Sequence, residues 1–113
     1  MADCIFCKIA SGTIPAKLVH ETDAVLAFND IHPAAPVHVL FISKKHIPTA
    51  NDLGQDDESV FSELAAAAVE VASDLGVDKT GYRLVVNCGG DGGQEVFHLH
   101  MHLLAGRKLG KMG

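Results

Sequence analysis

Three histidines at alternate positions are the residues of this chain best suited to chemistry. His98, His100 and His102 stand in the run HLHMHLL, residues 98–104. Successive side chains of a β-strand point to opposite faces, so the three imidazoles are predicted to share one face while the apolar residues between them face a core. An amphipathic strand whose polar side happens to be histidine is the alternative interpretation. The strict alternation, with a glycine-rich tract just upstream, favours a functional site.

The glycine-rich tract occupies residues 87–94, NCGGDGGQ, and ends four residues before His98. Its four glycines allow the backbone to approach a ligand closely with N–H groups pointing inward. Glycines also form ordinary loops, and the tract is not a Walker loop because no Lys-Ser or Lys-Thr pair follows it. Its position nevertheless predicts that Asn87 and the loop amides lie beside the histidine face.

Two kinds of chemistry suit this arrangement. A neutral imidazole attacks phosphorus when one ring nitrogen carries the lone pair and the other donates its proton to a fixed acceptor. Neighbouring histidines then hold that tautomer and shuttle protons to a leaving group. A His-x-His pair on a strand with a further histidine is also how proteins hold catalytic zinc. The spacing alone leaves both chemistries open.

The elements that must position these residues follow from the pattern of apolar residues and turn formers. The predicted strands cover residues 18–21, 24–28, 38–42, 82–86 and 99–104. The first two are expected to form a hairpin. Apolar residues at three-four spacing predict one long helix over residues 56–75, with Gly76 as its stop, and a short helix is expected over residues 3–9. This order predicts an α+β fold with a mostly antiparallel five-stranded sheet.

Length and composition narrow the class of protein. A chain of 113 residues with 48% hydrophobic and 20% charged residues suits a single globular domain spanning residues 1–113. The net charge of -5 argues against binding of long nucleic acids, although a nest of backbone amides still holds a single phosphate. No stretch approaches the ~20 apolar residues of a membrane helix, and the N-terminus lacks a basic region followed by an apolar stretch. We therefore expect a cytoplasmic protein that contacts no membrane.

The run of residues 98–104 fits His-φ-His-φ-His-φ-φ, the defining motif of the histidine triad (HIT) family. The residues GGQEVF before it resemble the Hint branch of that family, particularly its bacterial members. The likeness continues in order through residues 5–9, 14–16, 27–31, 36–38 and 81–87 and so covers nearly the whole chain. The resemblance implies a HIT-like fold and a homodimer. It also implies a purine nucleoside phosphoramidase that hydrolyses nucleoside phosphoramidates or acyl-nucleotides through a covalent nucleotidyl-histidine, without a cofactor for catalysis.

The same resemblance assigns roles to individual residues. His100 is expected to be the nucleophile that attacks the α-phosphorus of a purine nucleotide substrate. His98 and His102 are expected to flank the phosphate and orient it or relay protons, and His38 to pair with the nucleophile. Asp30 is expected to accept the ribose hydroxyls. The remaining expected contacts are Asn87, Gly93, Gln94 and Glu95 around the phosphate and Phe6, Ile9, Ile14, Phe28 and Ile31 around the base. For each of these apolar residues, core packing is the alternative.

Glu95 departs from the eukaryotic relatives, which commonly carry serine at the corresponding position. A serine hydroxyl meets the phosphate or the leaving group there, whereas a carboxylate aimed inward repels the phosphate. A Glu95 side chain turned to solvent, with a loop amide making the phosphate contact, is one way for the chain to accommodate this difference.

The pair Cys4-x-x-Cys7 is a second departure, because the best-known Hint proteins lack it. In a chain expected to be cytoplasmic, such a pair points to metal or redox chemistry before a disulfide. The pair is similar to the zinc-carrying part of the wider superfamily, where two cysteines join a histidine after the third strand and the first triad histidine. Those residues are here His46 and His98, and such a set suits structural zinc. A thioredoxin-like dithiol and plain buried thiols are the alternatives, and Cys88 has no evident partner.

Two other functions stay open beside the phosphoramidase. A zinc-dependent hydrolase would use all three triad histidines and lose activity on chelation. A non-catalytic nucleotide-binding or interaction module would bind nucleotide tightly without releasing a leaving group. The basic stretch 106–113, with Arg107, Lys108 and Lys111, either contacts the leaving group or is a mobile tail.

Overall fold

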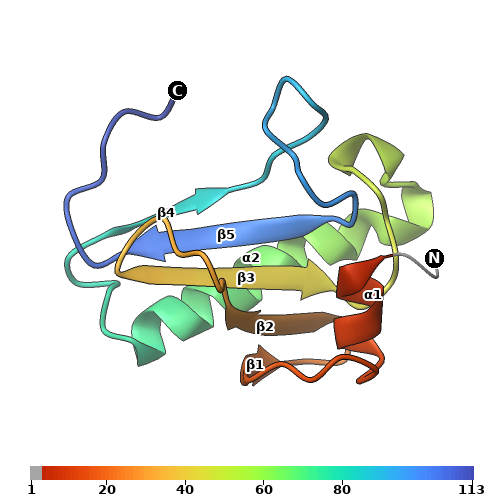
Figure 1. Ribbon diagram of the computed structural model, residues 1–113, viewed down its shortest axis with the longest axis horizontal. Coiled ribbons are helices and arrows are strands. Elements are labelled where there is room, and N and C mark those ends of the chain that lie inside the picture. The colour runs from red at the N-terminus through yellow and green to blue at the C-terminus, as the bar shows by residue number, and fades with distance from the viewer. Residues whose placement is uncertain (1–3) are drawn as a thin grey trace.

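A five-stranded sheet forms the centre of the structure, a computed structural model that describes residues 4–113 (Figure 1). The strands are β1 Leu18–Glu21, β2 Val25–Asn29, β3 Val37–Ser43, β4 Tyr82–Val85 and β5 His100–Ala105. Their order across the sheet is β1-β2-β3-β5-β4, and all four neighbouring pairs are antiparallel. The predicted α+β fold is therefore confirmed, and β1 and β2 form the expected hairpin.

Helices flank this sheet. They are α1 Ile5–Ala10, α2 Glu58–Asp74 and the two 3-10 turns Ala50–Asp52 and Gln55–Asp57. Helix α2 begins two residues later than predicted because the residues before it form a 3-10 turn, in which the Asp57 carboxylate accepts the Gly54 N–H at 3.1 Å. Gly76 lies just beyond α2 with a φ of 76°, the left-handed conformation predicted for the helix stop. Asp3, the expected first residue of the short helix, lies outside the described residues.

The two α-helices lie on opposite faces of the sheet (Figure 1). The core beneath α2 contains Val39, Phe41, Leu99, Met101, Leu103, Leu64, Ala68 and Val71. The core beneath α1 contains Phe6, Leu26, Phe28, Leu40 and Ile42. Full burial of apolar side chains of this size contributes about 1.5–3 kcal/mol each, so the position of β5 is strongly determined. The apolar residues between the triad histidines face the α2 core, as predicted.

The register of β3 against β5 sets which side chains share the face opposite α2. Leu40 pairs with His102, and Ile42 pairs with His100. Strand β5 begins at His100 rather than at the predicted residue 99, because the Leu99 N–H donates to the Ile47 carbonyl at 2.6 Å, beyond the end of β3. The first triad histidine, His98, therefore stands two residues before the strand instead of directly before it. Among residues 4–113, the structure has no helix with the length and apolar character needed to cross a membrane.

Candidate active site

A cavity of about 490 Å³ opens on the face of the sheet opposite α2. Its lining consists of Phe6, Asp30, His32, Ala34, His38, Leu40, Val85, Asn87, Gly93, Glu95, Val96, His100, His102 and Leu104. The floor comes from alternate residues of β3 and β5, and the sides come from the loops that follow β2 and β4. The sheet therefore supplies a rigid base for histidines while the loops supply the walls.

His100 lies in this cavity as a neutral ring with a free lone pair. Its Nδ1 is 2.7 Å from the backbone oxygen of His98. A carbonyl oxygen only accepts hydrogen bonds, so Nδ1 carries the proton and Nε2 carries the lone pair. Burial lowers the pKa of His100 below its ordinary value, which keeps the ring neutral near pH 7. Phe6 packs edge-on against the ring at a centroid distance of 5.1 Å and restricts its orientation.

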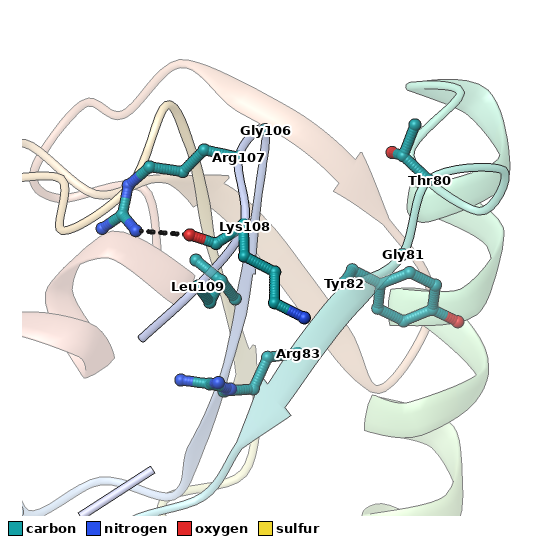
Figure 2. A pocket seen from close by; sticks show the side chains of 8 residues that line it. All are labelled: Thr80, Gly81, Tyr82, Arg83, Gly106, Arg107, Lys108 and Leu109. Atoms are coloured by element: carbon teal, nitrogen blue, oxygen red, sulfur yellow. Dashed lines mark hydrogen bonds between the residues drawn. The ribbon is translucent and has the colours of Figure 1, made fainter. Parts of the chain in front are cut away.

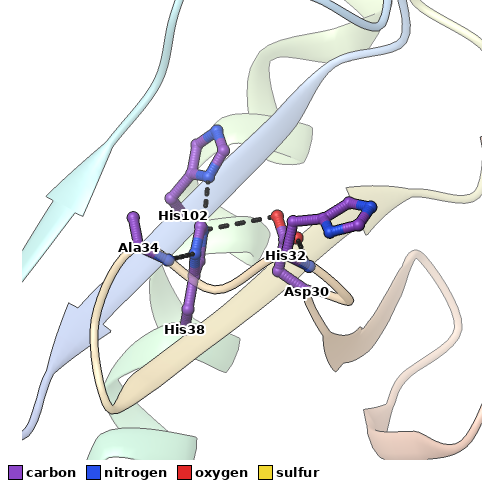
Figure 3. A network of polar contacts seen from close by, with 5 residues as sticks. All are labelled: Asp30, His32, Ala34, His38 and His102. Carbon is purple, nitrogen blue, oxygen red and sulfur yellow. Dashed lines mark hydrogen bonds and ion pairs between the residues drawn. The ribbon is translucent and has the colours of Figure 1, made fainter.

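His38 and His102 form a second, directional pair (Figure 3). The Ala34 N–H donates to His38 Nδ1 at 3.0 Å, so the proton of neutral His38 is on Nε2. That Nε2 lies 2.9 Å from His102 Nδ1, which must accept, and the proton of His102 is therefore on its own Nε2. Burial, followed by the charges of His100 and His38, lowers the pKa of His102 to about 4. The pair is a chain of fixed tautomers that presents an N–H donor beside His100.

Asp30 has one carboxylate oxygen in use and one available. Oδ1 accepts the His32 N–H at 2.8 Å, whereas Oδ2 is 3.6 Å from His38 Nε2, which is too long for a hydrogen bond. Asp30, His38 and His102 also have ligand atoms within 4.8 Å of one another, as a metal site requires. A metal on His38 Nε2 would displace its proton while Ala34 still donates to Nδ1, leaving an imidazolate. The hydrogen bond from Ala34 therefore opposes a metal at this position.

The glycine-rich loop is held together by its own side chains. Asn87 Nδ2 donates to the Gly92 carbonyl at 2.6 Å. Gln94 accepts the Gly89 N–H at 2.9 Å and donates to the Pro48 carbonyl at 2.8 Å. A Cβ on Gly92 would lie 2.5 Å from the Cys88 backbone oxygen, so only glycine fits there. The loop is therefore ordered before any ligand binds.

The cavity brings together some of the predicted site residues and leaves others out. Those that line it are Phe6, Asp30, His38, Asn87, Gly93, Glu95, His100 and His102. Those that do not are Ile9, Ile14, Phe28, Ile31, Gln94 and His98. Ile9 and Ile14 line a separate cavity of about 310 Å³, and Ile31 is 87% exposed on its loop. Phe28 is buried behind Phe6, with ring centroids 5.7 Å apart, and supports that wall from within.

Two of these placements differ from the expectation for physical reasons. Gln94 is only 6% exposed and uses its amide inside the loop, so it supports the loop from behind and does not line the cavity. His98 is fully buried, and its ring is occupied by other partners, so it does not flank the cavity. It contributes a backbone oxygen to His100 instead.

Several lining residues were not predicted from the sequence. They are His32, Ala34, Leu40, Val85, Val96 and Leu104. Strand alternation carries the signal for Leu40 and Leu104, which stand two residues from His38 and His102 and share their face. The contribution of Ala34 is its backbone N–H, which no residue type encodes.

The profile of the HIT domain matches residues 11–109 of this chain. The chain belongs to the HIT domain family. It is 45% identical over 108 residues to the purine nucleoside phosphoramidase of Escherichia coli K12, with 96% of this chain and 91% of that protein covered. A histidine triad protein from Clostridium difficile has a TM-score of 0.95 at 48% identity, covering 100% of this chain and 98% of that one. A HIT family hydrolase from Legionella pneumophila has a TM-score of 0.90 at 50% identity, covering 94% and 95%.

A cluster of cysteine and histidine side chains lies at the edge of this HIT domain. The Cys7 Sγ is 3.1 Å from His46 Nδ1, and His98 Nδ1 is 3.3 Å from Cys4 Sγ and 3.2 Å from His46 Nδ1. Tetrahedral zinc with Zn–S of about 2.3 Å and Zn–N of about 2.0–2.1 Å separates its ligand atoms by about 3.3–3.8 Å. The separations between the ligand atoms, 3.1–3.5 Å, lie at or slightly below this range, and all four atoms lie within 4.8 Å of one another, so the cluster can hold such an ion after small shifts.

The tautomer of His98 supports the same conclusion. Its Nε2 is 2.6 Å from the Ser43 carbonyl, so Nε2 carries the proton and Nδ1 aims its lone pair at the cysteine cluster. Burial lowers the pKa of His98, which favours the unprotonated nitrogen that a metal needs. The predicted ligand set Cys4, Cys7, His46 and His98 thus fits a structural zinc ion. Through the His98 backbone oxygen, this cluster connects to the position of His100.

A larger cavity of about 550 Å³ in the HIT domain has no histidine in its lining (Figure 2). Its lining is Thr80, Gly81, Tyr82, Arg83, Gly106, Arg107, Lys108 and Leu109, which includes no histidine and no carboxylate. Arg83 donates to the Gly110 carbonyl at 2.7 Å, and Arg107 donates to the Ala34 carbonyl at 3.2 Å. These bonds tether the basic C-terminal stretch, and Arg107 brings its start to the rim of the active-site cavity.

Proposed function

We propose that this HIT domain protein hydrolyses the P–N bond of purine nucleoside phosphoramidates, and the corresponding bond of acyl-nucleotides, to release a nucleoside monophosphate. The observation that carries the proposal is the hydrogen bond of 2.7 Å from His100 Nδ1 to the His98 backbone oxygen, which leaves Nε2 as a nucleophile in the cavity. The name of the E. coli relative, a purine nucleoside phosphoramidase, supports the choice of substrate class.

The reaction takes place in two displacements at phosphorus. His100 Nε2 attacks the α-phosphorus, the P–N bond to the amine breaks, and a nucleotidyl-histidine forms. His102 Nε2–H donates a hydrogen bond to the leaving nitrogen, which takes its proton from solvent and departs as the amine. Water then attacks phosphorus and the bond to His100 breaks, giving a nucleoside monophosphate and a neutral imidazole. The sum is one phosphoramidate and one water converted to one monophosphate and one amine.

The walls of the cavity suggest where the parts of a nucleotide bind. The free Oδ2 of Asp30 is an acceptor for ribose hydroxyls, and the loop amides at Asn87 and Gly93 face the phosphate. Phe6 and Leu40 offer apolar contact to the base. Apolar walls read the edges of adenine and guanine poorly, so we expect both bases to be accepted.

We further infer a homodimer, a structural zinc and residence in the cytoplasm for this protein of one domain, residues 1–113. Strand β4 pairs only with β5 among the described strands, so its outer edge is available to a second copy of the chain. Cys4, Cys7 and Cys88 form no disulfide with one another, which suits a reducing compartment. The fit of the Cys-His cluster supports zinc as a structural ion.

Replacing His100 tests this function. We expect His100→Ala and His100→Gly to lower turnover of an adenosine phosphoramidate with a fluorescent leaving amine by about a thousandfold or more. Circular dichroism and binding of AMP check that the fold and the cavity persist. Undiminished turnover in the folded variants would exclude His100 as the nucleophile.

Two further measurements separate the alternative functions. If the protein is a zinc-dependent hydrolase, a chelator should release a catalytic ion and abolish turnover. If His100 is the nucleophile, a rapid acid quench should trap a nucleotidyl-protein. A non-catalytic module predicts tight AMP binding with no burst of leaving amine. A quenched adduct that is absent from His100→Ala supports the proposal directly.

A further inference from the structure

The charge of the active-site cavity is opposite to what a phosphate site usually has. Among the described residues that line it, Asp30 and Glu95 are carboxylates, and none is lysine or arginine. The rings of His38, His100 and His102 are held by hydrogen bonds in which His38 Nδ1 accepts the Ala34 N–H, His102 Nδ1 accepts from His38, and His100 Nδ1 donates to the His98 carbonyl. The cavity therefore surrounds an anionic phosphoryl group with negative side chains and uncharged donors.

The two carboxylates lie on opposite sides of the nucleophile. Strand order places β2 and β4 on opposite sides of β5, and Asp30 follows β2 while Glu95 belongs to the loop after β4. His100 lies on β5 between them. If the ribose binds at Asp30, the leaving group on the other side of the phosphorus atom lies at the rim that carries Glu95.

Glu95 is held at this rim and its charge is uncompensated. The side chain of Gln94, directly before it, donates to the carbonyls of Pro48 and Val96 at 2.8 and 3.1 Å and so fixes the backbone on both sides of Glu95. No ion pair involving Glu95 is present among residues 4–113. Glu95 is exposed and is one of the residues that line the cavity.

We propose that Glu95 is a specificity-determining residue that selects the leaving group by charge, favouring amines that carry an additional positive charge and rejecting anionic ones. The proposal rests on the phosphoramidase function proposed above and names the substrate class of the same site. A leaving group with an ammonium places a cation beside the carboxylate, which also offsets the repulsion between Glu95 and the phosphoryl oxygens. A phosphate or carboxylate in the leaving group adds repulsion instead. Selection of the leaving group by charge would therefore explain why a carboxylate stands beside the site where a phosphate is proposed to bind.

Three matched substrates test this. We would measure kcat/KM for adenosine phosphoramidates whose leaving amines have the same length and end in an ammonium, a hydroxyl or a carboxylate. For the native chain we expect the order ammonium, hydroxyl, carboxylate, with about three- to tenfold between successive members at low salt and less at high salt. In Glu95→Gln the three values should converge to within about twofold, and in Glu95→Lys the order should reverse.

Asp91→Asn is the matched control, because Asp91 is an exposed acid of the same loop that does not line the cavity. It should preserve the native order. An unchanged order in Glu95→Gln and Glu95→Lys, with the hydroxyl substrate still hydrolysed, would overturn the proposal and leave the phosphoramidase function intact. No turnover of any of the three by the native chain would overturn the proposed function itself.

Discussion

Each histidine of the site takes its role from the partner of one ring nitrogen. His100 donates Nδ1–H to a backbone carbonyl, which frees the Nε2 lone pair. His38 accepts a backbone N–H on Nδ1, which makes Nε2 the donor. The first arrangement produces a nucleophile and the second a hydrogen-bond donor, although the side chains are identical. Main-chain groups of residues 98 and 34 therefore decide the chemistry.

A substitution at His38 tests whether the hydrogen bond from His38 sets the tautomer of His102. We expect His38→Phe to lower kcat by about tenfold to a hundredfold, because His102 Nδ1 loses its donor and the ring then samples both tautomers and other rotamers. The affinity for AMP should change little. His38→Gln should recover part of kcat, since an amide N–H replaces the imidazole N–H. Equal losses in both variants would show that His38 acts through packing alone.

At the scale of elements, helix α1 is too short to be stable by itself. It has six residues, and Phe6 is its one buried side chain. Cys4 caps it by accepting the Cys7 N–H at 3.3 Å, and both thiols face His46 and His98. A metal ion in this cluster would connect the helix to the segment before β5, which fixes one wall of the cavity and the carbonyl that holds His100.

Removal of that ion should therefore destabilise the protein. We expect the double variant Cys4→Ser/Cys7→Ser to lose stoichiometric zinc by elemental analysis and to melt about 5–10 °C lower than the zinc-loaded native chain. Chelation of the native protein should produce the same shift, and added zinc should reverse it. Cys88→Ser is the control and should keep both zinc and melting temperature. A native chain purified without zinc, whose melting temperature does not respond to added zinc, would contradict the structural role.

The sequence predicted the elements because the strands and α2 follow simple periodicities. The alternation through residues 98–104 placed His100 and His102 on one face and Met101 in the core. Prediction from the sequence fails where tertiary contacts determine the position of a residue. His98 lies before β5 because the Leu99 N–H bonds outside the ladder, and Ile31 is exposed although its neighbour Asp30 lines the cavity. Local pattern does not determine either outcome.

At the scale of the whole molecule, the fold holds titratable rings largely buried at the floor of a cavity. Burial lowers the pKa values of His38 and His102, the latter to about 4, against an ordinary value near 6.5. Between these values the unfolded chain binds protons that the folded chain does not. By linkage, the free energy of unfolding is unaffected above pH 6.5 and falls as the pH drops from 6.5 toward 4.

We expect the His102 contribution to lower the free energy of unfolding by about 2 kcal/mol between pH 7 and pH 5. The measurement is urea unfolding at several pH values in the Cys4→Ser/Cys7→Ser background, so that release of a metal ion at low pH adds nothing to the slope. Adding His102→Gln removes the titrating ring and should flatten the dependence in this window. The flattening follows from the sign of the shift, because a ring whose pKa were raised on folding would stabilise the protein in acid and its removal would steepen the slope. A slope that His102→Gln leaves unchanged would mean that this ring is protonated equally in the folded and unfolded chains.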